Sequence, residues 1–141
     1  MRTSSSTPIS SWLLVFVIGC SGSGQFPETV PVSGTVTYKG NPVPGIMITF
    51  LDADRDGSRP ASGITDQSGH YRLTTFKAND GAIPGEKKVQ INVVPPGDAD
   101  SPVKFADPTV QIPKRYSNSE ASGLTATVEN QNTVVDLDLR E

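Results

Sequence analysis

Val-Ser-Gly-Thr-Val-Thr-Tyr, residues 32–38, is the stretch that decides the fold. Positions 32, 34, 36 and 38 form one face of this stretch, which carries two valines, a glycine and a tyrosine, and the residues between them are polar. Alternation with a period of two is typical of a β-strand that buries one face and leaves the other in water. A strand of this kind needs other strands to cover its apolar face.

The rest of the chain supplies such strands, separated by turn residues. Glycine and proline together make up 25 of the 141 residues (13 plus 12), and they stand between short runs rich in Val, Ile and Thr. The period of two predicts six more strands, at residues 46–51, 61–65, 70–76, 87–94, 124–129 and 133–139. The second and third of these are expected to form a hairpin around residues 66–69. The inward-facing sets are expected to include Ile46, Ile48 and Phe50 in the first of these strands and Val89, Ile91 and Val93 in the fourth. The predicted fold is all-β: a seven-stranded antiparallel Greek-key β-sandwich, transthyretin-like or immunoglobulin-like.

Residues 95–123 show no periodicity and contain several prolines. A connection of that length is uncommon in a compact domain and tends to be functional or to have order of its own. Its role does not follow from the sequence.

The N-terminus is predicted to be an export signal. An apolar run, residues 12–18, follows a polar segment in which Arg2 is the only charged residue, and it ends at Gly19-Cys20. Seven residues are far fewer than the roughly 20 needed to span a bilayer, but they suit the core of a signal peptide. Residues 17–20, Val-Ile-Gly-Cys, resemble the bacterial lipobox, in which the cysteine receives the lipid.

Cys20 is the only cysteine of the chain, so it has no intramolecular disulfide partner, and lipid attachment explains an unpaired thiol in an exported protein. An ordinary secretory signal with an incidental cysteine is the alternative. The expected organisation is a lipoprotein signal peptide at 1–19, the lipidated cysteine and a flexible tether at 20–30, and the sandwich domain at 31–141. The expected location is the cell envelope, at the outer membrane or the periplasmic face. No cofactor is expected apart from the covalent lipid on Cys20.

The charge excludes some partners. The net charge is −3, and removal of residues 1–19 removes only Arg2 from the charged residues, so 11 basic and 15 acidic residues leave −4. A nucleic-acid-binding protein would carry a basic stripe. We therefore expect no nucleic-acid partner, and attachment to the membrane through lipid rather than through charge.

Asp52, Asp54 and Asp56 match the first half of a calcium loop, Asp-x-Asp-x-Asp-Gly. Calcium needs six to eight oxygen ligands and a bidentate carboxylate at the twelfth position, which here is Gly63. We therefore predict a solvated acidic turn and no metal site, with these three aspartates as weak candidates only.

The sequence predicts no enzyme. His70 is the only histidine and is expected at the start of a strand, where a catalytic or metal-binding role would need partners that nothing in the sequence identifies. One histidine and one lipid-bound cysteine also leave too few donors for a zinc site.

Phe105, Lys114, Arg115 and Tyr116 lie in the 95–123 connection. An exposed cluster of aromatic and basic side chains on a loop can contact a partner protein or a glycan. Alternatively, the two aromatic rings close one end of the sandwich, which a domain of this size favours because it needs its aromatic residues in the core.

The motifs together resemble a known family. Residues 32–38, the Pro-Val-Pro-Gly turn at 42–45 and the stretch 65–73 (Thr-Asp-Gln-Ser-Gly-His-Tyr-Arg-Leu) are similar, in order and spacing, to the carboxypeptidase regulatory-like domain, a transthyretin-like (prealbumin-like) sandwich. Residues 80–85, 112–116 and 122–128 resemble a version found in small bacterial lipoproteins, although Lys87 stands where those proteins usually have an aromatic residue. The resemblance implies a non-catalytic accessory domain, and a sandwich does not by itself dictate function.

The expected function is therefore that of a lipid-anchored envelope protein that acts as a binding or structural accessory, with an envelope protein or a polysaccharide as partner. A surface glycan-binding module and, less favoured, a calcium-dependent adhesion module are the alternatives.

Overall fold

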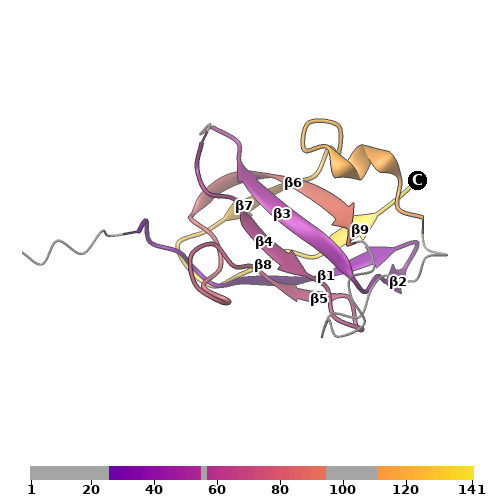
Figure 1. The fold of residues 1–141 in the computed structure, drawn as a ribbon, viewed down its shortest axis with the longest axis horizontal. Coiled ribbons are helices and arrows are strands. Elements are labelled where there is room, and N and C mark those ends of the chain that lie inside the picture. The colour runs from indigo at the N-terminus through magenta and orange to yellow at the C-terminus, as the bar shows by residue number, and fades with distance from the viewer. Residues whose placement is uncertain (1–25, 55–56, 95–110) are drawn as a thin grey trace, which may run out of the picture.

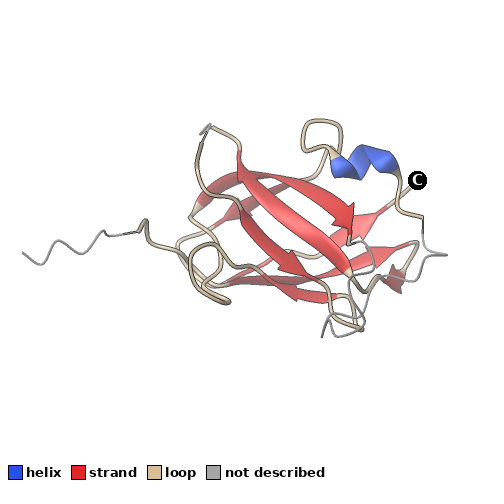
Figure 2. Cartoon of the chain, viewed as in Figure 1, coloured by secondary structure: helices blue, strands red, loops and turns tan. Residues whose placement is uncertain are grey.

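The structure is a computed structural model that describes residues 26–54, 57–94 and 111–141. These residues form short strands and one turn of 3₁₀ helix, in two layers of strands (Figures 1 and 2). The elements are β1 (Val32–Tyr38), β2 (Asn41–Pro42), β3 (Ile46–Asp52), β4 (Ala61–Ile64), β5 (His70–Arg72), β6 (Gly85–Val93), η1 (Lys114–Ser117), β7 (Thr125–Val128), β8 (Thr133–Val134) and β9 (Leu137–Leu139). The predicted all-β class is confirmed.

The two sheets form a sandwich. β1 is the centre of the first sheet, where β2 and β5 pair with it antiparallel and β8 and β9 pair with it in parallel. The second sheet has the order β4-β3-β6-β7, and all its pairs are antiparallel. The predicted sandwich is confirmed, while the expectation of purely antiparallel pairing is wrong for the C-terminal strands.

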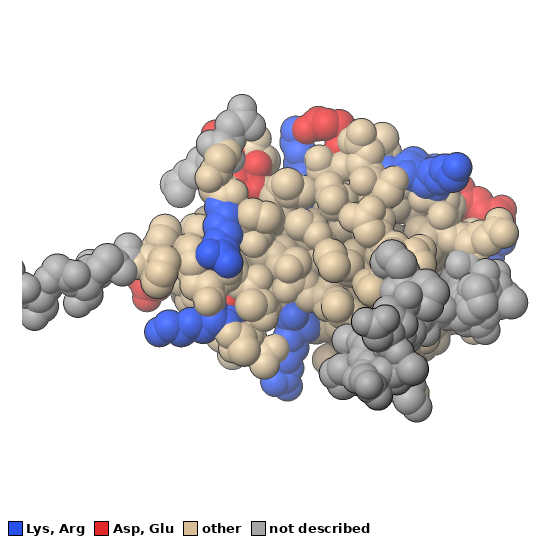
Figure 3. Space-filling view, viewed as in Figure 1, with Lys and Arg blue, Asp and Glu red and all other residues tan. Residues whose placement is uncertain are grey.

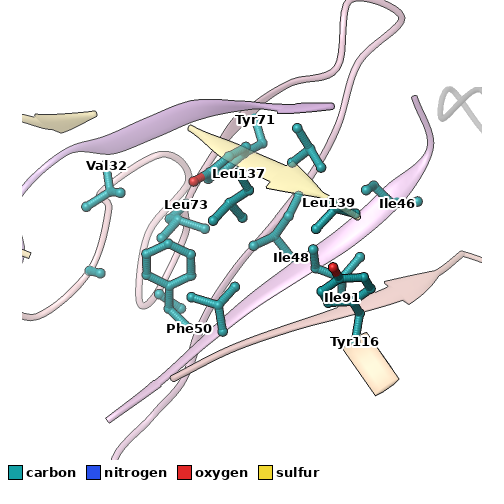
Figure 4. Packing of buried hydrophobic residues seen from close by; sticks show 14 of the residues in the cluster. Val32, Ile46, Ile48, Phe50, Tyr71, Leu73, Ile91, Tyr116, Leu137 and Leu139 are labelled. Atoms are coloured by element: carbon teal, nitrogen blue, oxygen red, sulfur yellow. The ribbon is translucent and has the colours of Figure 1, made fainter. Parts of the chain in front are cut away.

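The core lies between the sheets, where the inward faces predicted from the alternation meet (Figure 4). Ile46, Ile48 and Phe50 of β3 are buried, and Val89 and Ile91 of β6 lie in the same cluster. Each such side chain contributes roughly 1.5–3 kcal/mol by leaving water. Val93, expected inward, is an exception: it is the last residue of β6, and its side chain is 50% exposed although its cross-strand partner, Ile46, is buried.

The predicted strand 133–139 is two strands, since the chain bulges between β8 and β9. The Thr35 N–H donates to Asp136 Oδ1 (2.9 Å) rather than to a backbone oxygen, and the Tyr71 hydroxyl donates to the Val135 carbonyl (2.6 Å). Gly34 lies beneath this bulge, and a methyl group there would lie 1.8 Å from the Val135 oxygen. This bulge and the two-residue β2 account for nine strands where seven were predicted.

The predicted hairpin of residues 61–65 and 70–76 is only partly formed, because its strands belong to different sheets. Its turn is as expected: Asp66 Oδ1 accepts the N–H groups of Ser68 (2.8 Å) and His70 (3.0 Å). β5 then ends at Arg72, and the chain leaves the first sheet. β4 and β5 therefore lie side by side at one edge of the sandwich, and this edge carries the candidate site.

Candidate functional site

Several of the residues singled out in the sequence cannot be placed. Cys20, Asp56 and Phe105 lie outside the described residues. Within the described ranges, no helix has the length and apolar character needed to cross a membrane.

Asp52 has a structural partner. Its carboxylate forms an ion pair with the Lys87 ammonium directly across the β3–β6 ladder, and both side chains are nearly buried. A calcium ion at this turn would compete with that ammonium for Asp52, while Asp54 is exposed. The pair also explains how a lysine is accommodated on the buried face of β6: burial lowers the pKa of Lys87, and the Asp52 carboxylate supplies an opposite charge beside it.

Tyr116 is a core residue, as expected if the aromatic rings of the 95–123 connection pack on the sandwich rather than contact a partner. Its ring is 3% exposed, and its hydroxyl exchanges hydrogen bonds with the Arg140 carbonyl and the Arg140 N–H, both at 2.9 Å. Arg115 lies over this ring with its guanidinium carbon 4.9 Å from the centroid and donates to the Arg140 and Glu141 carbonyls. Lys114 and Arg115 are exposed, so the structure places the cations at the surface and the tyrosine beneath them.

On the face drawn in Figure 3, the charged side chains of the described residues form no concentrated patch. On the face in Figure 3, Lys and Arg side chains are spread singly over the surface and several lie close to Asp or Glu. His70 is exposed, and its Nδ1 lies 3.1 Å from the Thr35 hydroxyl.

A groove lies where β4 and β5 separate. Ser62 and Thr74 exchange both backbone hydrogen bonds (3.0 and 2.8 Å), and the Asp66 N–H donates to the His70 carbonyl (2.8 Å). Continuation of that register would pair Ile64 with Arg72, but no backbone hydrogen bond of the described residues joins them. In an antiparallel ladder, the backbone groups of alternate residues face opposite sides of the strand. The peptide group of Ile64 therefore faces away from β3, and that of Arg72 faces away from β1, so both lie on the side where β4 and β5 adjoin.

Gly63 sets the spacing of the two strands. A methyl group at Gly63 would lie 2.3 Å from the Arg72 carbonyl oxygen, so only a glycine lets β4 approach β5 this closely. The strands therefore lie backbone to backbone from the Ser62–Thr74 pair to Gly63, and their hydrogen-bonded pairing is interrupted only beyond Gly63, at Ile64. A single sequence does not reveal this approach, since Gly63 lies inside a run that alternates like an ordinary strand.

The groove has a volume of about 610 Å³ and is open to solvent. Its lining is mixed: Ile64 (36% exposed) and Met47 are apolar, His70 and Arg72 are basic or donating, and Asn79 is a neutral polar group. Apolar contacts and peptide groups without a strand partner are the features by which a sheet edge binds an extended polypeptide. The sequence analysis missed this site because its residues come from strands that were expected to pair.

The comparisons with known proteins include a structural likeness. No protein-family model matches the chain, and no curated protein matches it significantly. Among solved structures, it is similar to a DUF3823 family protein from Parabacteroides merdae, with a TM-score of 0.48 and 15% sequence identity over 81% of this chain and 47% of that one. The chain thus spans about half the length of that protein, and a likeness at this level assigns neither a family nor a function to it.

Proposed function

We propose that this protein is an exported, lipid-anchored accessory of the bacterial cell envelope, in which the sandwich binds an envelope protein and performs no catalysis. The observation that carries the proposal is the position of Cys20. It is the only cysteine, it ends a lipobox-like run, and it precedes by six positions Phe26, which already stacks on the folded domain.

The family resemblance supports an accessory role. Carboxypeptidase regulatory-like domains are typically non-catalytic, and residues 32–38, which belong to the motifs that carry the resemblance, form β1. We place this chain with those domains as a proposal, because order and spacing of short motifs support it.

The groove between β4 and β5 supports a polypeptide as the partner. Ile64 offers an apolar contact, and the Ile64 peptide group, which faces away from β3 and forms no backbone hydrogen bond with Arg72, suits the main chain of an added strand. A glycan would need exposed aromatic rings. Among the described residues, the exposed large hydrophobic side chains are Phe26, Ile64, Val93 and Val134, and the one aromatic residue of this set lies against Phe76 and does not line the groove.

Site-specific photo-crosslinking in the native host tests the proposal. A photoreactive amino acid is placed at Ile64, and a matched copy carries it at Thr127, which is exposed on β7 at the other edge of the same sheet. We expect one envelope protein to be crosslinked from position 64 and not from position 127, and this product to be lost in a Cys20→Ser copy. Equal products from both positions, or crosslinks to polysaccharide, would contradict a polypeptide site in the groove.

A further inference from the structure

We infer that the end of the sandwich that carries Phe26, Phe76 and Arg59 rests on the phospholipid headgroups of the membrane that holds the anchor. This inference goes beyond the partner site and rests on the proposed lipid attachment at Cys20. It assigns an orientation to the domain: one end meets the lipid, and the opposite end, with β2 and the C-terminus, points away from it (Figure 1).

The three side chains form a stack at the surface. The rings of Phe26 and Phe76 lie 4.7 Å apart at an interplanar angle of 26°, and the Arg59 guanidinium carbon lies 5.7 Å from the Phe76 centroid. Phe26 is 64% exposed, so it covers Phe76 on one side and presents the rest of its ring to the surroundings. The two rings thus form a small contiguous apolar surface rather than one isolated apolar side chain.

The stack is held by ordered backbone rather than by a loose tail. The Asp80 carboxylate accepts the N–H groups of Thr75 (2.7 Å), Phe76 (2.9 Å) and Lys77 (2.9 Å), which fixes the loop that displays the Phe76 ring. The segment with Phe26 is tied to the same loop, because Val30 and Ala82 exchange backbone hydrogen bonds of 2.9 and 3.0 Å. The two rings therefore form a preformed surface.

Chain length brings this surface to the membrane. Cys20 and Phe26 are six positions apart, and six residues span at most about 20 Å even when fully extended. β1 leads away from this end and is seven residues long, which corresponds to roughly 20 Å. A lipid on Cys20 therefore keeps Phe26 within reach of the headgroups, and contact of Phe26 with the headgroups would place the far end of β1 roughly 20 Å beyond them.

The chemistry of the stack suits that position. Aromatic rings at the boundary between hydrocarbon and water bury apolar area, and basic side chains approach anionic headgroups. Arg59 and the exposed Lys77 supply the positive charge, while Glu28 in the same segment opposes it. The two phenylalanines are thus the main contact, and the cations add a preference for anionic lipid.

The test uses a tryptophan as the reporter. The only tryptophan, Trp12, lies in the expected signal peptide, so the mature protein with Phe26→Trp carries one tryptophan, and Asn41→Trp gives a matched copy with the reporter at the far end of β1. Each full-length lipoprotein is reconstituted in vesicles of phosphatidylcholine and phosphatidylglycerol that contain a doxyl-labelled quencher lipid. We expect most of the emission to be quenched at position 26 and little at position 41.

A variant with a longer tether shows whether Phe26 binds the membrane itself or is only kept near it by the lipid on Cys20. Insertion of about twelve Gly and Ser residues after Ser23 adds a flexible chain of roughly 20 Å. Quenching at position 26 should survive this insertion and be lost when Phe76→Ser and Arg59→Ser are added to it. Quenching that disappears with the insertion alone would overturn the membrane contact and leave the anchor intact. A protein that does not enter the vesicles at all would overturn the lipid anchor itself, and with it this inference.

Discussion

The Tyr71 hydroxyl donates a hydrogen bond of 2.6 Å to the backbone carbonyl of Val135, across the bulge between β8 and β9. Tyr71 stands on β5 and its ring packs in the core, with the Phe50 ring 6.4 Å away between centroids. Burial, with the nearby Asp136 charge, raises the pKa of Tyr71, so the phenol stays protonated and remains a donor. One side chain thus joins the centre of the core to the C-terminal strands.

Removal of this hydroxyl is expected to destabilise the domain. Tyr71→Phe leaves the Val135 carbonyl without its donor, and the free energy of unfolding should fall by about 1–3 kcal/mol. Urea denaturation monitored by circular dichroism measures this. Tyr38→Phe, on a partly exposed ring of β1, is the control and should change little. Equal effects for the two variants would argue against the bond.

The buried ion pair of Lys87 and Asp52 should behave differently when one or both partners are replaced. Lys87→Met leaves a nearly buried carboxylate unpaired and should cost about 3–5 kcal/mol, whereas Lys87→Met with Asp52→Leu should be close to the native protein in stability. Lys88→Met is the matched control, because Lys88 pairs with the exposed Glu120 and such pairs contribute at most about 1 kcal/mol. A double variant as unstable as the single one would contradict this account.

Asp80 should make stability depend on pH. Partial burial opposes its ionisation, but the N–H groups of Thr75, Lys77 and Phe76 outweigh this and lower the pKa of Asp80 below its ordinary 3.8. A lowered pKa in the folded state stabilises the protein above the ordinary pKa, and this contribution is lost as the pH falls through the folded-state pKa. Asp80→Ala should therefore cost about 1–3 kcal/mol at pH 7.

The pH dependence of the Asp80 contribution is measured with acid unfolding curves of the native protein and the Asp80→Ala variant. The difference between the native protein and Asp80→Ala should shrink as the pH falls below about 4. Asp54→Ala, on an exposed side chain, is the control and should cost little at any pH. A difference that is constant down to pH 2 would show that the carboxylate charge does not hold the loop.

Gly63→Ala should disturb the groove. The added methyl group meets the Arg72 carbonyl and must push β4 away from β5, which is expected to cost about 1–3 kcal/mol. Crosslinking from position 64 should fall in the same variant, measured at a temperature where circular dichroism shows the protein folded. Ser62→Ala, one residue away on the same strand, should preserve both stability and crosslinking.

Local alternation predicted those parts of the fold that depend only on which face is buried. β1 has the predicted bounds, and the inward residues of β3 are the predicted ones. The Asp66 turn was also predicted, since its hydrogen bonds lie within the turn itself.

The failures have long-range causes. The break in residues 133–139 arises because Gly34, about a hundred positions earlier, lets Val135 approach and because Asp136 captures the Thr35 N–H. The groove arises because β5 pairs with β1 in the first sheet, whereas β4 pairs with β3 in the second. The alternation of residues within a strand does not show which sheet that strand joins. Lys87 could be interpreted only once its cross-strand partner, Asp52, was known.

Lipid attachment at Cys20 is tested by mass spectrometry of the N-terminal peptide of the mature protein, purified from the native host. We expect a peptide that begins at Cys20 and carries a lipid thioether with fatty acyl chains. Burial of these chains in the membrane contributes about 0.8 kcal/mol per methylene group and anchors the domain durably. An unmodified peptide, or one that begins at another residue, would contradict a lipid-anchored protein and the membrane-facing orientation derived from it.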